Sequence, residues 1–160
     1  MFRVISIVIF FTFSYSSFAC EKIKMAHKKL LESNFSVNRY FALSMDDERQ
    51  LKLKNIIKYN NGYLSRSNEE ILFIAKDFKH EEDNIEQFFI SDFICDNVKI
   101  EGEKVTIDFL YDDKHFISHF LYQNENLTPI KTIVEGEASF LFMSFNIKSV
   151  ANYSNFKLLP

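Results

Sequence analysis

Two histidines and an aspartate that could carry acid–base chemistry lie close together past the middle of the chain. Asp108, His115 and His119 belong to the stretch KVTIDFLYDDKHFISHFLY, residues 104–122, which also contains Thr106. A carboxylate beside an imidazole orients the ring and raises its pKa, as a general base requires. The residue types therefore indicate Asp108 with His119 as a catalytic acid–base pair, and His115 as a further catalytic candidate.

The same stretch predicts a β-hairpin that would bring these side chains to one face. Apolar and polar residues alternate from 105 to 111, which is typical of a half-buried strand. Asp112 and Asp113 predict the tight turn, since Asp tolerates the backbone angles of short hairpin loops. A two-residue turn places Asp108 diagonal to both histidines, whereas a four-residue turn places it opposite His119.

A polar, solvent-facing strand would contain the same residues without any chemistry. The spacing of His115 and His119 would suit a metal ion on a helix, but on a strand the two lie about 13 Å apart. The run from His80 to Asp83 has ligand chemistry too, yet consecutive residues do not converge on one ion, so it predicts a solvated acidic loop. We therefore expect neither a metal nor a cofactor.

The first 19 residues predict a signal peptide. Arg3 precedes an apolar run from Val4 to Phe13, and Ser17 and Ala19 satisfy the small-x-small rule for cleavage. The run is shorter than the roughly 20 residues that span a bilayer. We therefore expect an exported protein, periplasmic in a bacterium, with residues 20–160 as a single mature domain.

The two cysteines leave three alternatives open. Cys20 would be the first mature residue, as in bacterial lipoproteins, whose leaders this one resembles, although Ser17 and Phe18 depart from the preferred residues before a lipidated cysteine. A disulfide between Cys20 and Cys95 is the second alternative, because an exported protein meets an oxidising compartment. In the third, Cys95 is a buried free thiol.

The first half of the chain predicts helices. We expect them at residues 21–33, 45–59 and 67–78, with a linker from Asn34 to Leu43. Ser44 and Ser67 have the residue types and spacing of helix caps. His27 lies on the apolar stripe of the first helix, where we expect a packing role.

The second half predicts strands. They end near Ile100, form the hairpin of residues 104–122, and continue at 127–135, 138–146 and 149–159, the last at a sheet edge. Turn signals separate them, among them Glu101-Gly102. The predicted fold class is α+β, with N-terminal helices packed on a curved antiparallel sheet of about five strands. This order resembles the cone-like architecture of nuclear transport factor 2 or of cystatin, which implies a pocket between helices and sheet.

The charge composition argues against nucleic-acid binding. The net charge is −3, and the sequence has no basic run that could follow a nucleic-acid backbone. We expect a small exported, non-catalytic binding protein with a protein partner in the cell envelope, for example an inhibitor or immunity-type protein. One alternative is a small hydrolase or isomerase using Asp108 and His119; another is an envelope protein anchored by a lipid on Cys20.

Overall fold

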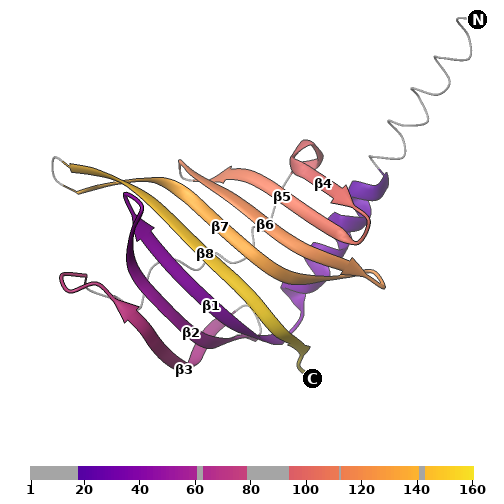
Figure 1. The fold of residues 1–160 in the computed structure, drawn as a ribbon. Coiled ribbons are helices and arrows are strands. Elements are labelled where there is room, and N and C mark those ends of the chain that lie inside the picture. The colour runs from indigo at the N-terminus through magenta and orange to yellow at the C-terminus, as the bar shows by residue number, and fades with distance from the viewer. Residues whose placement is uncertain (1–17, 61–62, 79–93, 112, 141–142) are drawn as a thin grey trace, which may run out of the picture.

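The computed structural model describes residues 18–60, 63–78, 94–111, 113–140 and 143–160. Within them, residues 18–32 form a helix, and eight strands form one antiparallel sheet (Figure 1). The strand order is β3-β2-β1-β8-β7-β6-β5-β4. The bounds are β1 Phe35–Met45, β2 Glu48–Asn60, β3 Tyr63–Ile74, β4 Val98–Glu101, β5 Lys104–Tyr111, β6 Lys114–Gln123, β7 Asn126–Phe140 and β8 Met143–Leu158. A short 3-10 helix, Cys95–Asn97, precedes β4.

The predicted α+β class is wrong, because the described part of the chain is mostly β. The first predicted helix is present, but the predicted linker is β1, the second predicted helix is β2, and the third lies largely in β3. The resemblance to nuclear transport factor 2 and cystatin rested on that fold class and is therefore wrong as well. In β2 the physical reason is the alternation of buried Leu51, Leu53 and Ile57 with lysines, a period of two that overrides the helical spacing of its apolar residues.

Two signals that we read as helix caps have other roles. Ser44, predicted as a helix cap, lies in β1 instead. Asp46 and Asp47, which follow it, have φ of 47° and 65° and form the turn between β1 and β2. Asp accepts this left-handed conformation more readily than most residues. The Asp46 carboxylate also accepts a hydrogen bond of 2.8 Å from the backbone N–H of Asn146. The predicted cap at Ser67 lies instead beside a register shift of β3, where Asn68 has a φ of 55°.

The central hairpin is confirmed, and of the two registers left open it has the one with a two-residue turn. Phe109 lies opposite Phe116, and Asp113 in the turn has a φ of 57°; Asp112 lies outside the described residues. The turn at Gly102, with a φ of 62°, is confirmed as well and joins β4 to β5. The predicted strands 138–146 and 149–159 have other bounds: β7 continues to Phe140, and β8 pairs with both β1 and β7, so it is not an edge strand.

The core lies between the helix and one face of the sheet, which we call the inner face. In Figure 1 the helix lies behind the sheet, so the view shows the outer face. The most deeply buried side chains of this core come from the helix and four strands: Ile23, Phe35, Val37, Ile57, Val105 and Leu127. Leu43, Leu51 and Leu53 form a second cluster with Phe41 and Phe78. Among the residues described, no helix is long and apolar enough to cross a membrane.

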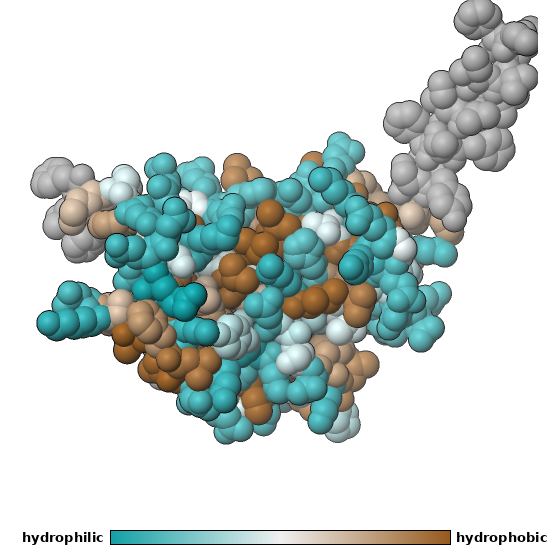
Figure 2. All heavy atoms as spheres, viewed as in Figure 1, coloured by the Kyte–Doolittle hydropathy of each residue, from teal (hydrophilic) through white to brown (hydrophobic). Residues whose placement is uncertain are grey.

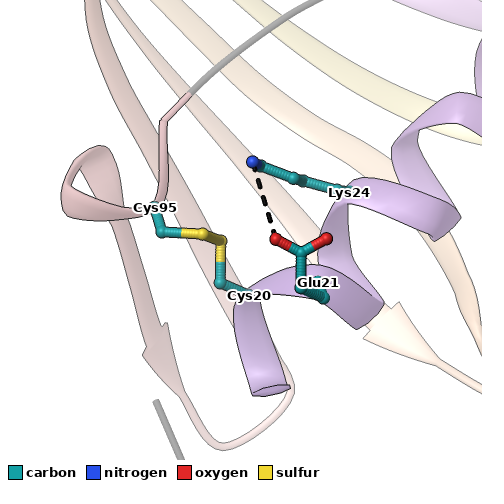
Figure 3. Close-up of polar contacts among 4 residues, drawn as sticks. All are labelled: Cys20, Glu21, Lys24 and Cys95. Carbon is teal, nitrogen blue, oxygen red and sulfur yellow. Dashed lines mark ion pairs between the residues drawn. A yellow bond between two sulfur atoms is a disulfide. The ribbon is translucent and has the colours of Figure 1, made fainter. Parts of the chain in front are cut away.

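A disulfide between Cys20 and Cys95 ties the helix to the segment before β4 (Figure 3). The two Cα atoms are 5.7 Å apart, and the residues are 75 positions apart in sequence. Beside the bridge, Lys24 pairs with Glu21 at 3.7 Å. Of the three alternatives for the cysteines, the disulfide is therefore the one that the structure contains. The disulfide uses the Cys20 sulfur, so a lipid attached to that sulfur would prevent the disulfide from forming.

Candidate functional site

The predicted catalytic residues lie together on the outer face. Asp108 is in β5 and His115 in β6, and the His115 Nε2 contacts the Asp108 Oδ1. Their side chains are 43% and 40% exposed. The register places Ile117 opposite Asp108, so Asp108 is diagonal to both histidines, as the two-residue turn requires. The right-handed twist of a sheet makes the two diagonals unequal, and here the contact formed is with His115.

His119 has a different partner from the one that we expected. It lies opposite Thr106, and the Thr106 Oγ1 is 3.1 Å from the His119 Nδ1. Partial burial and, less strongly, the positive charge of Lys131 lower the pKa of His119. The lowered pKa favours the neutral imidazole that a general base requires, but His119 contacts a hydroxyl rather than a carboxylate.

Charged residues continue along the outer face beyond the hairpin. Glu135 of β7 lies opposite His115 and forms an ion pair with Lys148 of β8, with 2.5 Å between Oε1 and Nζ. The hydrogen bond to Glu135 raises the pKa of Lys148. Figure 2 shows this face with hydrophilic residues over most of its area and hydrophobic residues gathered near its centre. Exposed ion pairs of this kind contribute little to stability, so the arrangement is that of a solvated sheet face.

A series of hydrogen-bonded polar side chains begins at Arg39 on the inner face, and the sequence analysis did not predict it. The Arg39 Nε of β1 donates a 3.0 Å hydrogen bond to the Asn55 Oδ1 of β2, and the Asn55 Nδ2 donates one of 3.3 Å to Glu69. The Arg39 guanidinium lies 5.1 Å from the ring centroid of Phe41. Arg39 and Asn55 are only 5% and 3% exposed. The sequence signal is an inward-facing arginine in the alternating pattern of β1, which we read as a linker.

His27 is a packing residue, as expected. It is buried in the helix, and its ring stands edge-on to Phe120 with 6.2 Å between centroids. Burial lowers the pKa of His27 to about 4. A histidine that remains neutral to such a low pH is suited to the core rather than to proton transfer near pH 7.

Within the described part of the chain, a run of exposed apolar residues lies on β3, at the end of the strand order. Four consecutive residues, Ile71 to Ile74, are each 41–47% exposed. In Figure 2 hydrophobic residues gather at the lower left, where Figure 1 places β3. In the described sheet only β2 pairs with β3. The opposite edge strand, β4, has four residues, two of them charged, and is thus short in the way that protects an edge.

No known protein family and no curated protein matches this chain in sequence. Among the described residues, no three His, Cys, Asp or Glu side chains come together as metal ligands would. The acidic run from His80 to Asp83 lies outside the described residues.

Proposed function

We propose that this chain is an exported, non-catalytic binding protein that takes up an extended segment of a partner protein at β3. The observation that supports this proposal is the run of four exposed apolar residues on an edge strand that, among the described strands, pairs with β2 alone. Backbone N–H and C=O groups at such an edge can pair with an added strand, while the side chains on both faces select the partner.

The strand has an apolar segment with acidic neighbours on one side. One register shift lies before this segment, between Ser67 and Glu70, and a second lies within it, between Ile71 and Phe73. Glu69 and Glu70 precede the run. Lys54 pairs with Glu70 at 2.8 Å on the β2 side. Isolated exposed apolar side chains are ordinary on protein surfaces, but four in succession on an edge strand favour association. A complementary partner segment would be apolar with lysine or arginine at one end.

The overall charge fits such a partner. The full chain has a net charge of −3, and removal of the leader with Arg3 leaves 18 basic and 22 acidic residues, a charge of −4. A negative protein associates faster with a positive partner. Export with a basic partner is the setting of an inhibitor or immunity-type protein, which is the form of this proposal that we favour.

The outer-face histidines support an enzyme less well. Acid–base catalysis uses groups whose pKa is tuned in a site that excludes water. Asp108 and His115 are both exposed by two fifths or more. A hydrolase or isomerase built on these residues would require that His115→Ala or His119→Ala abolish an activity without lowering the melting temperature.

Native mass spectrometry of the protein purified gently from its own host tests the proposal. We expect a complex of fixed stoichiometry for the unaltered chain and for Ile100→Lys, a matched change on the β4 edge. Phe73→Lys should remove the complex because it places an unpaired charge in the contact. A bare chain in all three samples, or a complex that Phe73→Lys leaves unchanged, would contradict strand addition at β3.

A further inference from the structure

We propose that the bond between Ala19 and Cys20 is a processing site that closes when the domain folds and oxidises, so that the leader is removed only before Cys20 pairs with Cys95. This inference rests on the export that is part of the proposed function. It concerns the order of two covalent steps, cleavage and disulfide formation.

The structure places this bond inside regular, packed secondary structure. Residues 18–32 form one helix, which runs through Ala19 and Cys20 without a break. Cys20 is 3% exposed and belongs to the same core cluster as Ile23, Ala26 and Leu30. A peptidase needs the chain around the bond in an accessible, locally unfolded form, so cleavage requires this part of the helix to leave the core.

The disulfide opposes that opening. Cys20 is joined to Cys95, which is itself tied through the 3-10 helix to β4 and so to the sheet (Figure 3). The residue on the carboxyl side of the bond therefore cannot leave the domain without carrying Cys95 and the start of β4 with it. A protein with both thiols reduced needs to release only the first turns of the helix.

Cleavage and disulfide formation are separate reactions, and atoms and electrons balance in each. Cleavage is a hydrolysis: water adds across the peptide bond and leaves a carboxylate on Ala19 and an amino group on Cys20. Pairing of Cys20 with Cys95 removes two electrons and two protons, which a disulfide-carrying oxidoreductase of the envelope accepts as its own disulfide is reduced. Oxidation before hydrolysis would leave the leader attached to a folded domain.

The test uses the full-length precursor, folded in detergent and treated with a bacterial leader peptidase. The oxidised chain should be cut more than about tenfold more slowly than the same chain in reductant, because the cross-link restricts local opening. The Cys95→Ala chain should be cut as fast as the unaltered chain in reductant, whether or not reductant is present. Equal rates for the oxidised and reduced chains, both fast or both slow, would overturn the inference.

A variant with an undocked helix separates this failure from failure of export itself. Ile23→Asp combined with Cys95→Ala places a charge in the core and frees the helix. If this chain is cut after Ala19, the leader is functional whatever the result for the oxidised protein. If even this chain is not cut there, the leader assignment fails, and with it both this inference and the export in the proposed function.

Discussion

Removing the Cys20–Cys95 disulfide should lower the stability of the domain by a large and calculable amount. The bridge closes a loop of 75 residues. In the chain-entropy treatment a loop of this length stabilises the folded state by about 4.5 kcal/mol, because the reduced unfolded chain has many more conformations. The contribution is a large fraction of the 5–15 kcal/mol that is typical of a whole domain.

The expected shift in melting temperature follows from the size of the mature chain. If residues 1–19 are removed as proposed, 141 residues remain. A domain of that size has an unfolding entropy of about 0.3 kcal/mol per degree, so the loss corresponds to about 15 °C. Thermal unfolding followed by circular dichroism would compare the oxidised protein, the reduced protein and a Cys20→Ala, Cys95→Ala double variant.

The reduced protein and the double variant serve as controls for each other. The reduced protein retains both sulfur atoms, so its loss of stability measures the effect of the cross-link alone. The double variant should unfold at the same temperature with and without reductant. A loss below about 2 kcal/mol in both would refute the reasoning, since it would mean that the unfolded chain gains little freedom from reduction.

Three further perturbations test particular parts of the structure. The unfolded state binds a proton on His27 below pH 6.5, whereas the folded state does so only near pH 4; stability should therefore fall by about 3 kcal/mol between these pH values. His27→Leu should remove that part of the pH dependence in denaturant titrations, and the exposed control His115→Gln should leave it unchanged. Leu53→Ala, in the buried second cluster, should cost about 3 kcal/mol of unfolding free energy, whereas Ile71→Ala on the exposed edge should cost under about 1 kcal/mol. Gly102→Ala should cost about 1 kcal/mol from backbone strain alone, because φ is 62° and no atom lies within 4 Å of the added carbon.

The sequence was informative where local pattern and turn chemistry agreed. From residue 104 to 122 the alternation of side chains and the Asp112-Asp113 turn indicated the same hairpin, and one of the two registers left open is the one observed. The first helix and the cysteine pair were also recovered. In β2 the adjacent Ile56 and Ile57 completed a helical stripe, and we gave it more weight than the alternation Leu-Lys-Leu-Lys before it.

The remaining errors arose from non-local pairing. β1 and β8 lie side by side although about 100 residues separate them, as in the pair Leu43 and Ser149. No local pattern reports such a neighbour, so β8 was divided and assigned to an edge. For the candidate site, the face was predictable but not the partners, because the twist of the hairpin decides that Asp108 contacts His115. The buried Arg39 was missed because its strand was taken for a linker.

Site-specific photocrosslinking in the producing cells tests the central proposal most directly. A photoreactive amino acid at position 73 of β3 is compared with one at position 99 of β4 and one at position 119 on the outer face. The proposal of strand addition predicts a single crosslinked product of fixed mass from position 73 alone, which disappears when Ile71→Lys is added. Crosslinks of equal yield from all three positions, or a product from position 119 in place of position 73, would contradict it.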